Sequence, residues 1–69
     1  MITEIGIVAG EIWYYLDSKN GAANFSDLKK GVDRPDNTLL MSLGWLAREG
    51  YVVLEGLPKE DYRITLRKQ

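Results

Sequence analysis

The sequence contains no cysteine and no histidine. These absences exclude disulfides, thiolate nucleophiles, imidazole metal ligands and a histidine general base. The three serines, Ser18, Ser26 and Ser42, therefore lack the usual group that activates a hydroxyl, and no carboxylate pair has a spacing that forces a shared site. No phosphate-binding glycine loop or metal-ligand cluster occurs. We expect a protein that is not an enzyme and that uses no cofactor and no metal.

Long apolar runs are also missing. No hydrophobic stretch approaches the roughly 20 residues that a helix needs to cross a bilayer. The N-terminal segment carries Glu4 and no basic region, unlike a secretory signal peptide. We therefore expect a soluble protein of the reducing cytoplasm, with no membrane partner and no evident small-molecule ligand.

Positive charge is scarce for a nucleic-acid binder. The sequence has a net charge of -1 and a pI of about 5.2, whereas domains dedicated to nucleic acid commonly have a pI above about 9. The charge is unevenly spread, because the stretch up to Leu28 has a net charge of -3 and the stretch from Lys29 onward has +2. Any contacts with phosphate are therefore expected in the second half.

The chain has room for one hydrophobic core. A domain of 69 residues buries only about 60% of its unfolded surface, so its stability depends on every apolar stripe. We expect a single domain over residues 1–69.

The clearest pattern lies between residues 36 and 54. Leu39, Leu43 and Leu46 recur at helical spacing, Leu40 and Ala47 widen this stripe, and Gly50 stands where a left-handed residue ends a helix. The next four residues, 51–54, are aromatic, β-branched or aliphatic, which favours a strand. The chain is therefore predicted to pass from helix to strand without a linker.

The first helix is predicted over residues 3–18. Its core stripe consists of Ile5, Val8, Ala9, Ile12 and Leu16. Ile7, Gly10 and Tyr14 fall near the opposite side, where an amphipathic helix should be polar. Gly6 and Gly10 are costly inside a helix, which suggests that another backbone or a bulky ring approaches them closely. An interface and a set of isolated exposed apolar residues explain this face equally well.

Shorter elements fill the remainder of the chain. Ala22 and Ala23 follow a turn and could form a very short strand, and Ser26 is predicted to cap a second helix that ends at Gly31. Residues 33–36 supply the cap of the third helix. After residue 51 the period changes to two, which predicts a hairpin with a projecting, mobile loop over residues 56–61. Its inward positions are Val52, Leu54, Tyr62, Ile64 and Leu66.

The order helix, strand, helix, helix, strand, strand resembles the winged helix-turn-helix fold. The segment Leu46–Val52, LAREGYV, resembles the passage from recognition helix to wing in many bacterial regulators. IGIVAGEIWYYL together with LGWLAREGYV is similar to a family of small stand-alone bacterial winged-helix domains of unassigned function. The resemblance implies an α+β fold with three helices packed on a small antiparallel sheet.

The resemblance also implies a mode of DNA binding. The third helix would enter the major groove of duplex DNA and the wing would reach the backbone or the minor groove. The candidate contacts are Lys29, Lys30, Arg34, Asn37, Thr38, Ser42, Lys59 and Arg63. Acidic residues stand beside several of them, and each basic residue has an ordinary explanation, such as interaction with a helix dipole or an exposed strand face. A transcription-regulator-like domain that dimerises on DNA is placed first because the fold most often has this role.

The alternative is a protein-interaction or homodimerisation module that does not bind DNA. Its candidate interface is Ile7, Gly10, Tyr14 and Met41, and the acidic pI favours it. Trp45 is predicted to pack beneath the wing, because large aromatic side chains are usually buried.

Overall fold

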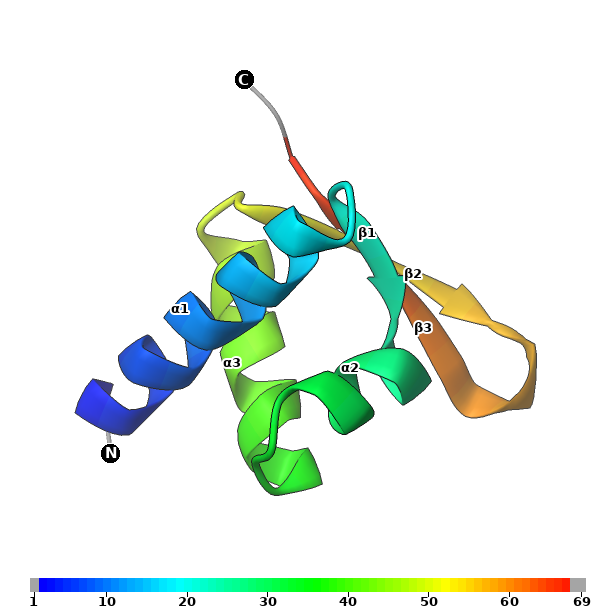
Figure 1. The fold of residues 1–69 in the computed structure, drawn as a ribbon. Helices are drawn as coiled ribbons and strands as arrows, with labels where there is room; N and C mark the ends of the chain where they lie inside the picture. The colour runs from blue at the N-terminus through cyan, green and yellow to red at the C-terminus, as the bar shows by residue number, and fades with distance from the viewer. Residues whose placement is uncertain (1, 68–69) are drawn as a thin grey trace.

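The computed structural model describes residues 2–67 and confirms the winged helix-turn-helix arrangement. Its elements are α1 (Ile2–Ser18), β1 (Ala22–Asn24), α2 (Phe25–Gly31), α3 (Asp36–Arg48), β2 (Val52–Leu57), the short 3₁₀ turn η1 (Pro58–Glu60) and β3 (Asp61–Leu66). The antiparallel sheet has the order β1-β3-β2. The helices lie together, and the β2–β3 hairpin projects away from them (Figure 1). Within residues 2–67, no helix combines the length and the apolar character required to cross a bilayer.

The core forms where the predicted stripes of α1 and α3 meet the sheet. Val8, Ala9, Ile12 and Leu16 are buried as expected, whereas Ile5 is only half-buried. The other buried apolar residues are Phe25, Leu28, Val32, Leu39, Leu43, Leu46, Val52, Ile64 and Leu66. Leu54 and Tyr62, which the strand pattern places inward, remain 40% and 42% exposed. Leu54 lies beside the buried Ile64 but on the edge strand of the sheet, and Tyr62 lies nearer the wing, opposite Gly56.

The junction between α3 and β2 has the geometry that Gly50 predicts. Gly50 has φ of 82°, its N–H donates to the Ala47 carbonyl oxygen at 3.1 Å, and the Tyr51 N–H donates to the Leu46 carbonyl oxygen at 2.9 Å. These two bonds form a Schellman motif, which satisfies carbonyl groups at the helix end. The Arg67 N–H then donates to the Tyr51 carbonyl oxygen at 2.9 Å, so the hairpin begins directly after the helix.

The buried face of α3 is rotated from the one that the sequence predicts. Leu40, expected to widen the core stripe, is 46% exposed, whereas Thr38 and Ser42 are 8% and 0% exposed. Trp45 and Leu46 line a groove with α1, and Ser42 lies between them on the helical wheel, so it faces α1. The Ser42 hydroxyl donates to the Thr38 carbonyl oxygen at 2.8 Å, which makes its burial possible.

The N-terminal cap of α2 comes from β3. The prediction that Ser26 caps this helix was wrong, because α2 begins at Phe25 and Asn24 at the cap position makes no side-chain bond. Instead, the Asp61 carboxylate accepts the Ser26 N–H at 3.2 Å and the Ser26 hydroxyl at 2.9 Å. Asp61 also accepts the Tyr62 N–H at 2.8 Å. These bonds, with that from Tyr62 the strongest influence, lower the pKa of the Asp61 carboxyl.

The wing is more regular than the predicted loop. Strand pairing continues to Leu57 and resumes at Asp61, so the connection is only Pro58–Glu60 rather than residues 56–61. Lys59 and Glu60 have φ of 64° and 57°, the left-handed conformation that glycine and asparagine tolerate best.

Candidate interaction surfaces

Two of the predicted DNA contacts are not on the surface. Ser42 is completely buried and Thr38 is nearly so, because α3 turns these residues toward the interior. Their assignment as base or phosphate contacts was therefore wrong. The spacing of Leu39, Leu43 and Leu46 places the centre of the buried face on that stripe, whereas the packing of α1 shifts the centre toward Ser42.

Arg34 is held by a carboxylate of the same chain. Its Nε donates to Glu11 Oε1 at 3.0 Å and its Nη2 donates to Oε2 at 2.7 Å, a bidentate pair between α1 and the α2–α3 turn. The hydrogen bond to Arg34 lowers the pKa of Glu11, and the same bond raises the pKa of Arg34. This guanidinium is already paired and does not present a free charge to phosphate.

Lys29 is also engaged, although more loosely. Its Nζ lies 3.7 Å from Asp36 Oδ2 and 5.4 Å from the centroid of the Phe25 ring. The contact joins α2 to the first residue of α3. Asn37, the next residue of α3, is exposed and remains on the surface where the sequence places it.

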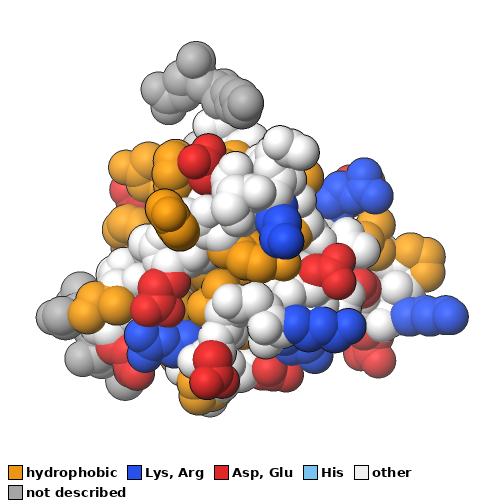
Figure 2. Space-filling model, viewed as in Figure 1, with side chains coloured by type: hydrophobic (Ala, Val, Ile, Leu, Met, Phe, Trp, Pro, Cys, Tyr) orange, Lys and Arg blue, Asp and Glu red, His pale blue; other side chains and the backbone are white. Residues whose placement is uncertain are grey.

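Three predicted basic contacts have no ion pair among residues 2–67, namely Lys30, Lys59 and Arg63. They lie on α2, η1 and β3 respectively, so the fold does not gather them on one element. On the face seen in Figure 2, Lys and Arg side chains alternate with Asp and Glu instead of forming one basic patch. The electrostatic surface of this face is therefore mixed.

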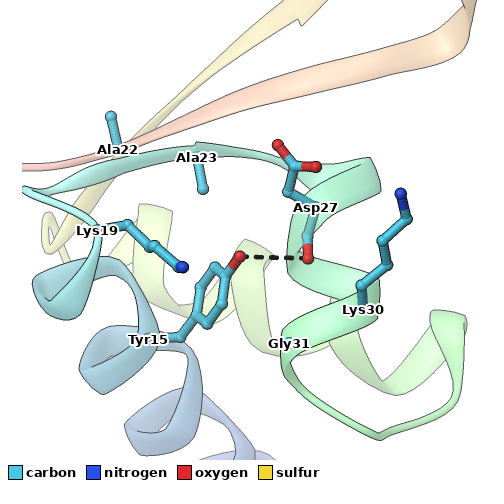
Figure 3. Close-up of a pocket in the computed structure, with 7 residues that line it drawn as sticks. All are labelled: Tyr15, Lys19, Ala22, Ala23, Asp27, Lys30 and Gly31. Carbon is cyan, nitrogen blue, oxygen red and sulfur yellow. Dashed lines mark hydrogen bonds between the residues drawn. The ribbon is translucent and has the colours of Figure 1, made fainter.

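Lys30 lines an open recess of about 540 Å³ together with Lys19, the Tyr15 ring and the small residues of β1 (Figure 3). The Tyr15 hydroxyl donates to the Asp27 carbonyl oxygen at 3.3 Å. Lys19 lies over the ring, with its Nζ 5.6 Å from the centroid, and Lys30 extends from the opposite side of the recess. The two ammonium groups do not converge, so the recess is not built as an anion site.

Gly31 forms part of the wall of this recess and contacts Tyr15 closely. A Cβ atom at Gly31 would overlap the ring, at 2.7 Å from Cδ1 and 2.9 Å from Cζ. The residue has no positive φ, so the close approach of the ring, rather than the backbone conformation, requires glycine here.

The solvent face of α3 is largely apolar. We define the α3 solvent face by its exposed residues at helical spacing, which are Asn37, Leu40, Met41, Gly44 and Arg48. Leu40 and Met41 are 46% and 47% exposed, and the one cation, Arg48, lies in the last turn. The helix that a winged-helix protein would insert into DNA therefore presents two aliphatic or thioether side chains at its centre.

A second apolar surface follows α1. Ile7 and Tyr14 are 55% and 75% exposed, so these interface candidates lie on the surface as predicted. Beside them, α1 and α3 enclose a groove of about 230 Å³, which we call the helix groove. Its lining residues are Gly6, Ala9, Gly10, Trp13, Trp45, Leu46 and Tyr51.

The helix groove corrects two expectations. Trp45 does not pack beneath the wing, because it is 44% exposed and stacks on Tyr51 with ring centroids 6.3 Å apart. Apart from the adjacent residues and backbone of α1 itself, no atom of the described residues comes within 4 Å of a Cβ placed at Gly6 or Gly10, so the close approach inferred from these glycines does not occur within residues 2–67. Trp13 and Tyr51 are not among the interface candidates from the sequence. The spacing of Gly6, Gly10 and Trp13 along one line of α1 is the signal that identifies this side.

No site for metal chemistry is formed by the described residues, because no three carboxylates among them gather closely enough to hold an ion. A comparison with curated proteins gave no match, and a comparison with solved structures gave none either. A family model described as a winged helix-turn-helix domain (DUF2582) matches residues 1–68. With the helices, sheet and wing described above, this match shows that the chain belongs to the DUF2582 family of winged helix-turn-helix domains.

Proposed function

We propose that this winged helix-turn-helix domain is a protein-interaction module that binds its partner through apolar side chains of α1 and α3. The observation that carries the proposal is the α3 solvent face, where Leu40 and Met41 are nearly half exposed and Arg48 is the only cation. Major-groove readers need side chains that donate and accept hydrogen bonds at this position. Methionine and aromatic residues are enriched in protein interfaces instead.

The amount of exposed aromatic surface supports this function. Trp13, Trp45 and Tyr51 are each between 42% and 48% exposed around the helix groove. At roughly 150–250 Å² for a complete aromatic side chain, each contributes about 100 Å² of accessible area. A standard interface buries about 800 Å² on each partner, so these three rings would supply over a third of it.

The count of free cations points in the same direction. A protein that makes roughly 6–10 phosphate contacts depends on a dense basic surface. Here Arg34 is paired with Glu11 and Lys29 lies beside Asp36. The cations of residues 2–67 that form no ion pair are Lys19, Lys30, Arg48, Lys59, Arg63 and Arg67, and they are not gathered on one element.

The test compares variants of the two surfaces. Tyr14→Glu and Trp45→Glu place charge on the apolar surface, whereas Lys59→Glu and Arg63→Glu reverse charge on the wing, and all four positions are exposed. The tagged chain is used to isolate bound proteins, and each partner is then measured with all four purified variants. We expect the first pair to weaken partner binding and the second pair to leave it intact. Loss of binding only in the wing variants would refute the proposal, and circular dichroism checks that every variant is folded.

Duplex DNA is the second candidate, and one observation favours it. Lys59 stands at the tip of the projecting wing and has no ion pair within residues 2–67, a suitable position for contact with the DNA backbone. Titration with nonspecific duplex at about 50 and 200 mM salt, followed by backbone amide shifts, tests this candidate. Salt-sensitive shifts at Lys30, Asn37, Lys59 and Arg63 would favour DNA. Their absence at both salt concentrations would exclude nonspecific DNA affinity.

A further inference from the structure

The outer edge of β2 carries backbone groups that no described strand pairs. The sheet order β1-β3-β2 places β2 at an edge. Tyr51 accepts a hydrogen bond from Arg67, and bonded and non-bonded pairs alternate along an antiparallel ladder. The Tyr51 carbonyl group and the N–H and C=O groups of Val53 and Glu55 are therefore directed toward β3, while the Tyr51 N–H donates to Leu46. The corresponding groups of Val52, Leu54 and Gly56 point outward, and no hydrogen bond from a helix or loop of residues 2–67 reaches them.

This edge has few of the features that normally prevent strand pairing. Proteins protect exposed edges with proline, lysine, bulges or very short strands. The other edge strand, β1, has only three residues, but β2 has six, VVLEGL, with no proline and no cation. Val53 and Leu54 are 51% and 40% exposed along it. The strand is therefore suited to pairing with another strand.

We propose that β2 pairs in antiparallel fashion with β2 of a second copy of this chain, about a two-fold axis at Leu54, and so extends the sheet from three strands to six. This pairing goes beyond the proposed function, because it uses the sheet edge and not the apolar surfaces of the helices. Each interaction can fail without affecting the other.

The register follows from the outward groups. An axis at Leu54 places Leu54 opposite the partner's Leu54, and Val52 opposite the partner's Gly56, so all three outward residues of each copy form hydrogen bonds. An axis at Val53 would instead place Gly56 opposite the partner's Gly50. Gly50 has φ of 82° and is not extended, so that register would lose the outer pairs.

The side chains of this register complement their own copies, which is why a second copy is the occupant. On the inner face, Leu54 would lie between Ile64, its neighbour on β3, and the partner's Leu54, so its exposed part would be covered by apolar groups. Gly56 lies opposite Tyr62 and has open space at the position of a side chain, so the partner's strand can approach this end of β2 without a clash at Gly56.

On the outer face, the same register places Val53 opposite the partner's Glu55. Glu55 lies opposite Arg63 in the β2–β3 register, although no ion pair joins these two described side chains. Each carboxylate therefore stands between an arginine of its own chain and a valine of the partner. The two Glu55 residues do not face one another, so like-charge repulsion is avoided.

Amide hydrogen exchange of the purified chain at low and high protein concentration tests the pairing, with sedimentation velocity on the same samples. The amides of Leu54 and Gly56 should become protected only at high concentration, together with dimer formation. The amides of Val53 and Glu55, which bond to β3, should be protected at both concentrations. Exchange of Leu54 and Gly56 that is equally fast at both concentrations would overturn the proposal, whether the chain is monomeric or dimerises elsewhere.

Two variants at one position test the register. Val53→Glu would place a carboxylate opposite the partner's Glu55, and the two-fold symmetry would repeat this repulsion once. The dimer dissociation constant should therefore rise by about tenfold. Val53→Lys introduces a side chain of similar exposure opposite the partner's Glu55 and should retain dimerisation. Equal weakening by both variants would refute the register. If the chain binds a protein partner but never dimerises, the proposed function stands and the β2 pairing is refuted. If the chain dimerises through β2 but binds no protein partner, the pairing stands and the proposed function is refuted.

Discussion

Gly31→Ala should destabilise the fold although alanine is the better helix former. The added Cβ would overlap the Tyr15 ring, which is held by its hydrogen bond to the Asp27 carbonyl oxygen. Overpacking of this kind costs about 1–3 kcal/mol, and displacement of the ring adds the loss of a hydrogen bond worth about 1 kcal/mol. Alanine recovers at most about 1 kcal/mol through helix propensity. We therefore expect a net loss of about 1–3 kcal/mol.

Gly44→Ala is the matched control. Gly44 also lies in a helix, but apart from its neighbours and the local backbone of α3 no atom of the described residues lies within 4 Å of the position that an added methyl group would take. Propensity alone should stabilise this variant by about 0.8 kcal/mol. In a domain of this size about 1 kcal/mol shifts Tm by about 4–8 °C, so thermal unfolding should separate the two variants by more than about 8 °C.

A third variant identifies the cause. In a Tyr15→Ala background the overlap is absent, so Gly31→Ala should no longer destabilise the protein. The double-mutant cycle should then give a coupling of about 2–4 kcal/mol, the overpacking and hydrogen-bond costs together. Equal Tm values for Gly31→Ala and Gly44→Ala, or additive effects in the cycle, would refute the assignment of Gly31 to the Tyr15 contact.

Three further predictions concern the α2 cap, the wing and the helix groove. The pKa of Asp61 is lowered from its ordinary value of 3.8, so the stability that this carboxylate contributes is present above that value and is lost as the pH falls through the lower folded-state pKa. Thermal melts at different pH values should therefore show a smaller decrease of Tm in acid for Asp61→Asn than for the unchanged chain. Glu60→Gly should relieve the positive φ at this position and raise the free energy of unfolding by about 1 kcal/mol, which is measured as a higher denaturant midpoint; an unchanged midpoint would contradict the strain. Gly10→Ala should increase the free energy of unfolding by about 0.5–1 kcal/mol through helix propensity, and so raise Tm. It should also weaken partner binding through the helix groove, and unchanged affinity would exclude close contact of the partner at this residue.

The parts of the fold that local patterns determine could be predicted from the sequence. Leu39, Leu43 and Leu46 are buried, and Gly50 ends α3 with a positive φ, because side-chain periodicity and glycine conformation act within one or two turns. The order of the elements followed from such patterns. The predicted wing loop was too long because propensity does not show how far strand pairing continues.

The surfaces depend on distant residues and were harder to predict. The cap of α2 comes from Asp61, 35 residues beyond Ser26, and no local cap pattern contains it. The rotation of α3, which buries Ser42 and exposes Leu40, depends on where α1 packs. The size of Trp45 favours burial, but the small residues of α1 leave a groove in which its ring remains half exposed.

The position of β3 in the middle of the sheet determines when the fold can close. Both β1 and β2 form their hydrogen bonds with β3, and β1 is separated from it by about 40 residues of chain. During synthesis, α1 to α3 therefore leave the ribosome before the sheet that covers their apolar faces exists. Contacts of such large sequence separation slow folding, because loop closure must occur before they form. The domain is thus expected to complete its folding only after residue 66 has emerged, and a nascent chain that stops before β3 would expose its helices to chaperones.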